Sequence, residues 1–396
     1  MRITTHRAGI LALALAGSLG ASVQAAEVGG VFRFGVPYPQ SGGIAEYGAN
    51  YSDGIRMAVQ EINGKGGITV GGQKVKVEAV FCDTQADTSK AAACGRRLSA
   101  QERVRAMLIS TSLETFPLMS FNNEGKSSFL IISSSASNKL VALNNPLVAR
   151  YWFNTYSYMA PFNRALKDAL ATVDSTSQTV AIMQSEDEFG KAWADTFWKG
   201  WTSAGGTLGQ TATYASMSTD FYPQLTALLK NKPGILAVPG PCPQVAPIVK
   251  QARELGFTGR FIFQVSCGPE EIVKSVGERA IAGSIFEGSE WDLKSARLTQ
   301  FREAFKKMFK REAVVISADG YAQAMWLFSS VQAAASLDDP KKIRAAMGPT
   351  LNQDWNILGI KDLQSNGETT AAIHPRIFKA LNNIVDYTGN NAQAAK

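Results

Sequence analysis

Short apolar runs alternate with longer amphipathic segments along most of the chain, and this alternation is its clearest structural signal. The apolar runs predict strands, the amphipathic segments predict helices, and the series begins again after an extended run near residue 150. Strands that alternate with helices favour right-handed βαβ units, so the pattern predicts an α/β protein with two lobes built on parallel sheets. The expected strands are 31–36, 75–81, 104–109, 128–132, 178–184, 207–213, 234–238 and 260–265, and the expected helices are 48–63, 87–101, 114–123, 159–172, 189–204, 221–231 and 244–255.

The last third of the chain departs from this alternation. An apolar run at 285–288 precedes two long helical patterns, 296–309 and 318–337, and a short one at 341–347. The tail from 355 to 381 predicts further strands. Because no low-complexity linker separates the two halves, we expect a hinge between them rather than a flexible tether.

The N-terminus has the three parts of a secretory signal peptide. Arg2 and Arg7 supply a positive start, residues 8–19 form a short apolar stretch, and Val23-Gln24-Ala25 offers small residues for cleavage after Ala25. The apolar stretch is too short to span a bilayer. An amphipathic first helix of a cytoplasmic protein is less well supported, since the stretch has no polar face. We therefore expect a soluble protein exported to the periplasm.

The charge pattern and the small number of histidines argue against nucleic-acid binding, metal binding and catalysis. The net charge is +7, but basic and acidic residues are interspersed, and the densest basic cluster, residues 306–311, indicates a solvated helix face rather than a nucleic-acid site. There are 2 histidines, and His6 leaves with the signal peptide. His374, beside Pro375, is expected at the surface. Without a histidine-rich site, a G-x-S-x-G elbow or a phosphate-binding loop, we expect no metal, no cofactor and no catalysis.

The 4 cysteines suggest two disulfides in an oxidising compartment. Cys82 ends a predicted strand and Cys94 lies in the helix that follows. Cys242 and Cys267 each come just after one of two consecutive strands, which would lie about 4.8 Å apart if they are neighbours in a parallel sheet. Spacing therefore favours the pairs 82–94 and 242–267, although the other two pairings remain possible from sequence alone.

An ordered series of motifs resembles the type I periplasmic solute-binding proteins of ABC importers, in particular the branched-chain amino-acid (leucine/isoleucine/valine) class. The resemblance extends over essentially the whole mature chain, and its strength lies in the order of the motifs rather than in any one of them. The matching segments are 41–43, 47–48, 54–59, 61–68, 80–83, 110–117, 130–137, 181–190, 249–256 and 317–325.

The resemblance implies two Rossmann-like lobes joined by a three-strand hinge, with crossovers near 151–154, 285–288 and 348–358. A small ligand, either amino-acid-like or an organic carboxylate or amide, would bind between the lobes at the carboxyl ends of the strands and be passed to ABC permease subunits in the inner membrane. We expect a monomer. The implied divisions are residues 1–25 as signal peptide, 26–153 with 287–347 as the first lobe, and 154–286 with 348–396 as the second.

The family's carboxylate-binding serine corresponds to Ser112, at a strand-to-helix junction where hydroxyls and backbone N–H groups converge. Plain helix capping is the alternative, because Thr111 to Glu114 also fits a capping box in which Glu114 is the partner. The next loop of the site runs through Ser134, Ser135 and Ala136, with alanine where the family has a threonine. An ordinary turn rich in serine is the alternative there.

Aromatic positions of the family's cleft correspond to Tyr47, Tyr156 and Phe189, and Phe189 replaces a tyrosine. Core packing is the alternative for each.

In the second lobe, Cys242 stands where relatives that bind aliphatic amino acids have a tyrosine. Cys267 stands where they have the glutamate that pairs with the ligand's ammonium. A buried ammonium without an acid is costly. We therefore hypothesise a ligand without a free α-amine, such as a carboxylate or an amide.

Two other functions share part of this evidence. A periplasmic sensor for a kinase or chemoreceptor would need the same fold and cleft, and neighbouring genes would distinguish it from a transport receptor. A secreted enzyme on a double Rossmann scaffold has less support, because no acid/base pair is evident in the sequence.

Glu270 and Glu271 could replace the glutamate that the family has at the position of Cys267, although their positions are typical of the first turn of a helix.

Overall fold

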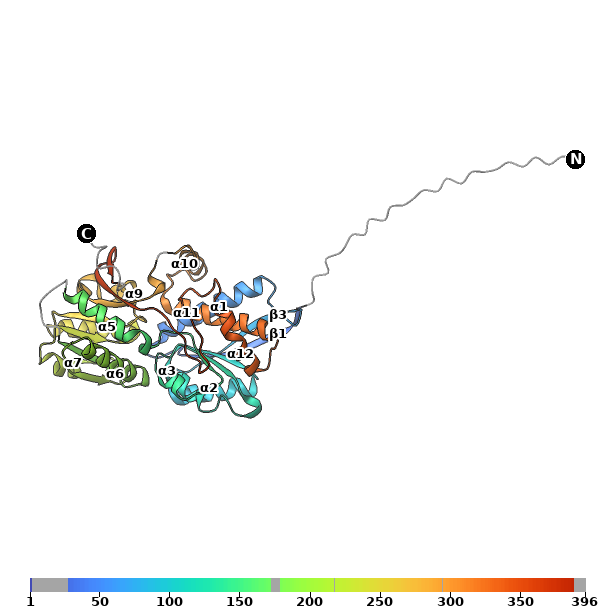
Figure 1. The fold of residues 1–396 in the computed structure, drawn as a ribbon, viewed down its shortest axis with the longest axis horizontal. Helices are drawn as coiled ribbons and strands as arrows, with labels where there is room; N and C mark the ends of the chain where they lie inside the picture. Colours follow the sequence, from blue (N-terminus) through green and yellow to red (C-terminus); the bar gives the residue numbers. More distant parts are fainter. Residues whose placement is uncertain (2–27, 172–178, 217, 294, 388–396) are drawn as a thin grey trace.

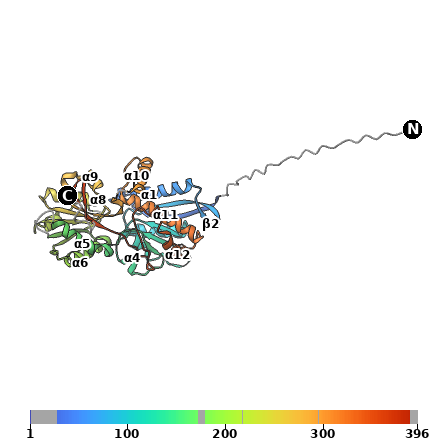
Figure 2. The same cartoon turned by 45° about the horizontal axis from the view of Figure 1, so that its top comes forward.

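The computed structural model describes residue 1 and residues 28–171, 179–216, 218–293 and 295–387, and it shows two lobes that lie side by side (Figures 1 and 2). Apart from residue 1, the predicted signal peptide lies outside these ranges. Each lobe contains one sheet with helices packed around it. None of the helices within these ranges combines the length and the apolar composition needed to cross a membrane.

The first lobe is built on a six-stranded sheet with the order β2-β3-β1-β4-β5-β6. Its neighbouring strands run parallel except for the antiparallel pair β2 and β3. This is the predicted parallel arrangement with one added edge strand. The strands are β1 (Val28–Tyr38), β2 (Ile68–Val70), β3 (Gln73–Asp83), β4 (Ala106–Ile109), β5 (Leu130–Ser133) and β6 (Val148–Arg150), and the helices between them are α1 (Ala45–Gly64), α2 (Thr88–Arg96), α3 (Ser112–Met119) and α4 (Lys139–Ala142).

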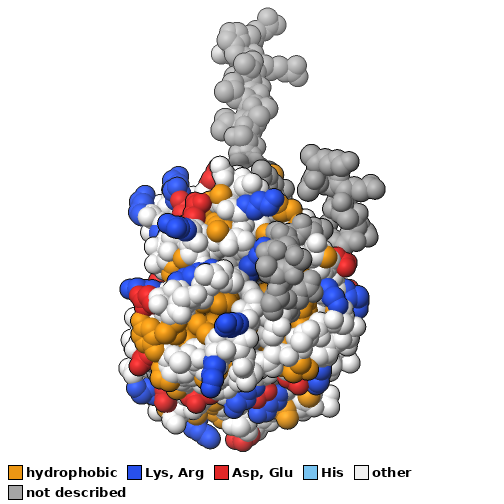
Figure 3. All heavy atoms as spheres, turned by 90° about the vertical axis from the view of Figure 1, so that its left-hand side faces the viewer, with side chains coloured by type: hydrophobic (Ala, Val, Ile, Leu, Met, Phe, Trp, Pro, Cys, Tyr) orange, Lys and Arg blue, Asp and Glu red, His pale blue; other side chains and the backbone are white. Residues whose placement is uncertain are grey.

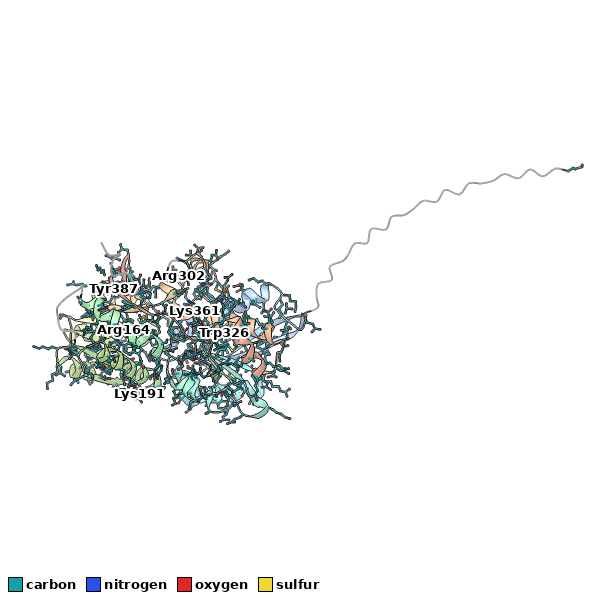
Figure 4. The ribbon with its side chains drawn as sticks, in the orientation of Figure 1. Arg164, Lys191, Arg302, Trp326, Lys361 and Tyr387 are labelled. Carbon is teal, nitrogen blue, oxygen red and sulfur yellow. A yellow bond between two sulfur atoms is a disulfide. The ribbon has the colours of Figure 1, made fainter. Side chains whose placement is uncertain are left out.

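Three helices from the end of the chain complete this lobe: α10 (Ala296–Phe309), α11 (Val315–Ala334) and α12 (Pro340–Thr350). Helix α11 packs against both α1 and α12. Nearly every residue of α11 is buried, because other helices and the sheet surround it. Trp326 of α11 lies inside the lobe, and its indole Nε1 donates to the carbonyl of Met347 at 2.9 Å (Figure 4).

The second lobe is built on a seven-stranded sheet with the order β13-β12-β11-β10-β9-β7-β8. Strands β7 to β11 run parallel, and the last two strands are antiparallel. On the face of this lobe seen in Figure 3, Lys and Arg side chains are scattered among acidic and apolar ones. The strands are β7 (Val180–Ser185), β8 (Thr211–Tyr214), β9 (Ile235–Val238), β10 (Arg260–Phe263), β11 (Ile285–Gly288), β12 (His374–Ala380) and β13 (Asn383–Asp386), and the helices are α5 (Thr155–Ala171), α6 (Glu188–Ser203), α7 (Tyr222–Leu229), α8 (Cys242–Glu254) and α9 (Pro269–Val276).

The chain passes between the lobes after β6, after β11 and after α12. Three passages close together in space restrict how the lobes can move relative to each other. The predicted fold class, two α/β lobes with mainly parallel sheets, is confirmed. The residue numbers assigned above to the lobe boundaries stay a prediction.

The strands expected in the tail from 355 to 381 are confirmed only at its end, where β12 forms part of the second sheet. Residues 355–373 are mostly irregular, with one isolated bridge between Lys361 and Thr370, because they run along the first lobe instead of joining a sheet. His374 is not a surface residue: its side chain is 14% exposed, and its Nε2 lies 3.3 Å from the Asp386 carboxylate. The pairing of β12 with β13 brings this acid against it.

A buried ion pair holds the irregular tail to the first lobe. The guanidinium of Arg150, at the end of β6, is fully buried and donates to Glu368 at 2.7 Å. It also donates to the carbonyl oxygens of Ser135 and Ser137, so that it fixes the loop after β5. Burial lowers the pKa of Arg150, and the Glu368 carboxylate opposes that shift.

Replacing Glu368 by glutamine should lower the free energy of unfolding by about 3 kcal/mol, because a buried guanidinium would lose its counter-charge. Urea denaturation followed by tryptophan fluorescence would measure the loss. The Asp195→Asn variant is the control, since Asp195 forms an exposed pair with Lys199 that should contribute almost nothing. A Glu368→Gln variant as stable as this control would contradict a structural role for the buried pair.

Candidate ligand-binding site

A cavity of about 60 Å³ lies between the lobes, at the carboxyl ends of the strands of both sheets. Its volume is well below the roughly 300–1,000 Å³ of ordinary small-molecule pockets, so a ligand of more than a few atoms requires the lobes to move apart. The first lobe contributes Ile44, Tyr47, Ser110 to Leu113, Ser134, Ala136 and Trp152. The second lobe contributes Asp187, Phe189, Pro241, Gln244, Gln264 and Ser266.

Three helices begin at this cavity, one from the first lobe and two from the second. Helix α3 begins at Ser112, α6 at Glu188 and α8 at Cys242, and the N-cap residues Thr111, Asp187 and Pro241 all line the cavity. A helix N-terminus carries partial positive charge and unpaired N–H groups, which favour an anion. The described lining contains no lysine or arginine. Any negative group bound here would therefore depend on helix ends and neutral donors.

Hydrogen bonds fix the hydroxyl groups of the first lobe. The Oγ atoms of Ser112 and Ser135 lie 2.7 Å apart, as do those of Thr115 and Ser133. The Ser134 hydroxyl donates to the buried carboxylate of Asp319, which lies behind the cavity wall on α11. The serine loop after β5 is therefore a network held from behind, and not only a polar turn.

The expected capping box at α3 is only half formed. Thr111 caps the helix, since its Oγ1 accepts from the N–H of Leu113 at 3.1 Å. Glu114 does not accept from the backbone N–H of Thr111, as a capping box requires; its fully buried carboxylate accepts from the hydroxyls of Thr84 and Thr111. Burial raises the pKa of Glu114, and those two hydroxyls oppose the shift. Glu114 is absent from the cavity lining.

The chain matches a protein-family model described as "Periplasmic binding protein" over residues 31–374. It belongs to the periplasmic binding protein family. Solved structures also resemble it throughout. The leucine binding protein LivK of Thermotoga maritima is 24% identical, with a TM-score of 0.74 over 89% of this chain and 97% of that one.

Two other proteins of similar fold, a substrate binding protein and a solute binding protein, were solved with ligands. The LivJ protein of Streptococcus pneumoniae, in complex with isoleucine, is 19% identical, with a TM-score of 0.73 over 90% of this chain and 99% of that one. An ABC-transporter solute binding protein of R. palustris, in complex with benzoate, is 18% identical, with a TM-score of 0.75 over 90% and 96%. At these identities the likeness establishes the shared fold.

Five of the residues predicted to bind ligand do lie together on the cavity of this periplasmic binding protein: Tyr47, Ser112, Ser134, Ala136 and Phe189. The phenol of Tyr47 donates to the carbonyl of Ser110 at 3.3 Å, which places its ring across the first-lobe wall. Contact of these residues with a ligand stays a prediction.

Four predicted residues lie outside the lining. Ser135 is buried one layer back, where its hydroxyl supports Ser112. Tyr156 is 45% exposed at the start of α5. Cys242 and Cys267 form a buried disulfide with a Cα–Cα distance of 4.6 Å, and Cys82 is bonded to Cys94, so both predicted pairs are confirmed. The disulfide between Cys242 and Cys267 ties together the two loops that carry Pro241 and Gln264.

Several lining residues were not predicted, including Trp152, Asp187, Gln244, Gln264 and Ser266. The apolar pattern placed Gln264 inside the strand 260–265, but β10 ends at Phe263, so Gln264 follows the strand. The rule that ligands bind beyond the carboxyl ends of parallel strands could have identified it, had the strand end been known.

Two further acids lie behind the cavity without touching it. Asp319 is enclosed by the first lobe, and burial raises its pKa to about 8 despite hydrogen bonds from Ser134 and Gln323. In the second lobe, Glu287 accepts from Trp193, Tyr158 and the N–H of Val265, and burial raises its pKa to about 7. Neither carboxyl has a basic partner among its hydrogen bonds, so each favours the protonated state.

Glu270 and Glu271 do form the first turn of α9, and they line a different cavity of about 900 Å³. They therefore do not replace an acid in the smaller cavity. Over the described residues, no group of three or more His, Cys, Asp and Glu side chains is placed to hold a metal ion.

The double variant Cys242→Ser/Cys267→Ser should bind ligand more weakly, because the loops carrying Pro241 and Gln264 lose their covalent tie. It should also lose about 3 kcal/mol of stability, from the closure entropy of a 25-residue separation. The Cys82→Ser/Cys94→Ser variant is the matched control: it should lose similar stability but keep its affinity. Calorimetric titration and thermal denaturation would compare the affinities and stabilities of the two variants. Equal affinities would rule out a role of the Cys242–Cys267 disulfide in the site.

Asp319 should make stability depend on pH. Its pKa in the folded protein, about 8, exceeds the value of 3.8 for a free side chain, so folding favours the protonated form. This stabilisation is complete below about pH 4 and disappears as the pH rises through about 8. In urea denaturation between pH 5 and pH 9, the Asp319→Asn variant should therefore lose less stability than the parent chain. Parallel profiles for the two proteins would show that Asp319 is ionised in the folded state.

Proposed function

We propose that this periplasmic binding protein is the extracytoplasmic receptor of an ABC importer, which captures a small carboxylate or amide between its lobes and delivers it to permease subunits. The observation that carries the proposal is a cavity lined by both lobes, at the carboxyl ends of both sheets and at three helix N-termini. Ligand bound there would stabilise the closed arrangement of the lobes, which is the form a permease would recognise.

The chemistry of the lining supports a carboxylate. Ser112, Ser134 and the first N–H groups of α3 offer neutral donors to an anion in the first lobe. The lining's single described carboxylate, Asp187, already accepts from the N–H of Gly190 and from the hydroxyls of Ser185 and Ser216. A ligand ammonium would have to share this carboxylate with the cap of α6, which supports a ligand without a free α-amine.

We further propose that the chain acts in the periplasm as a monomer after cleavage following Ala25, and that it catalyses no reaction. The signal-peptide pattern supports export, and membership of a family of binding proteins supports a purely receptive role. No observation favours the sensor alternative over transport.

A thermal-shift screen of the mature chain, unfolded and refolded to remove bound ligand, tests this function. The panel holds proteinogenic amino acids, aromatic and aliphatic carboxylates, amides and polyamines. A ligand at 100 times its Kd adds about 2.7 kcal/mol, which raises Tm by several degrees. Stabilisation by carboxylates or amides, followed by loss of uptake of that solute in a deletion strain, is the expected result. Stabilisation by no member of the panel would count against the proposal.

The Ser112→Ala variant should bind the identified carboxylate about 10-fold more weakly, because a charge-assisted hydrogen bond at the start of α3 is lost. Calorimetric titration would measure the change. Ser120→Ala is a matched control at the other end of α3, where the Ser120 hydroxyl donates only to the carbonyl of Pro117. If both variants bind as tightly as the parent chain, Ser112 does not hold the carboxylate.

A further inference from the structure

The side chain of Gln264 has an orientation that hydrogen bonding fixes. Gln264 is 1% exposed and lines the cavity from the second lobe. Its Oε1 accepts from the backbone N–H of Ser266 at 2.8 Å and from the Ser266 hydroxyl. Because a backbone N–H can only donate, the amide oxygen must face Ser266, and the amide NH₂ must face the other way.

That NH₂ group has no hydrogen-bond partner, although it is buried. The phenol oxygen of Tyr158 is close enough to interact weakly with this NH₂ group, which lowers the phenol's pKa, but the contact does not reach the geometry of a full hydrogen bond, and the phenol donates its own proton to Glu287. Across the cavity, the hydroxyl of Ser110 is also buried and unpartnered. A buried donor without an acceptor is destabilising, so both groups are better satisfied when a ligand supplies one.

The second glutamine of the lining shows the contrast. The Nε2 of Gln244 donates to the carbonyl of Ser216 at 2.8 Å, so its amide is already satisfied by the protein. Gln264 therefore has N–H donors at the cavity from which a ligand could accept a hydrogen bond. An ammonium can only donate, so it could not bond to this NH₂ group, and both groups would remain unpaired.

We infer that Gln264 determines specificity by selecting a ligand with an uncharged hydrogen-bond acceptor beside its carboxylate, so that a 2-oxo acid is preferred to the corresponding 2-amino acid. The acceptor is uncharged because the described lining holds no lysine or arginine to balance a second negative charge. Ser112 and Ser134 line the same cavity as Gln264, so an acceptor bound by Gln264 would lie beside a carboxylate bound by the two serines. The inference rests on the proposed receptor function and specifies its ligand class.

Matched pairs of acids test it: pyruvate against alanine, and 4-methyl-2-oxopentanoate against leucine. Each pair keeps the carbon skeleton and exchanges an acceptor for a donor at C2. Titrated into the mature, ligand-stripped protein, the oxo acid should bind about 10- to 100-fold more tightly than its amino partner, which is the ratio that one unpaired buried donor implies. The Gln264→Leu variant should lose this preference, and Gln264→Glu should shift it toward the amino acid.

Gln251→Leu is the control, because the amide of Gln251 in the same lobe is satisfied by Phe221 and Thr219, away from the cavity. It should keep the oxo-to-amino ratio of the parent chain. Equal binding of the two members of a pair by the parent chain would overturn the inference and leave the receptor function standing, as would an unchanged ratio in a folded Gln264→Leu variant. Failure of every acid to bind would count against receptor function for carboxylates and against this inference together.

Discussion

The buried guanidinium of Arg150 joins three parts of the molecule that the site depends on. It ends an edge strand of the first sheet, holds the carbonyl oxygens of the serine loop and pairs with Glu368 in the last passage between the lobes. A fully buried cation is tolerated only where its donors are satisfied. These bonds hold the loop that carries Ser134 and Ala136 in place, since moving it would leave buried N–H donors of Arg150 without acceptors.

Around this anchor, the described lining of the cavity is neutral except for the carboxylate of Asp187, which caps α6. Its anion-attracting character comes from helix N-termini, while the acids behind it, Asp319 and Glu287, favour the protonated state because burial raises their pKa values. A neutral acid close to the site does not repel a carboxylate, whereas an ionised one would. The same burial that costs these groups their charge thus keeps the cavity suitable for an anion.

Much of the fold was predictable from sequence because it follows from periodicity. Strands such as β9 and helices such as α10 appear at the expected positions, since short apolar runs and amphipathic segments report burial directly. The two disulfides followed from where strands end. The irregular course of residues 355–373 and the partial burial of His374 were not predictable, because polar residues can lie against another lobe or pair with an acid that is distant in the pattern.

The sequence by itself determined the two α/β lobes, the cysteine pairs favoured by spacing, and the serine-rich junctions where Ser112 and Ser134 meet the cavity, because each depends on local pattern and on the ends of neighbouring parallel strands. Only the tertiary structure decided that Glu114 turns inward, that Tyr156 lies outside the lining, and that Gln264 presents an unpaired amide to the ligand. These properties depend on which partners reach each polar atom, and partners far apart in the chain are brought together only by the packed fold.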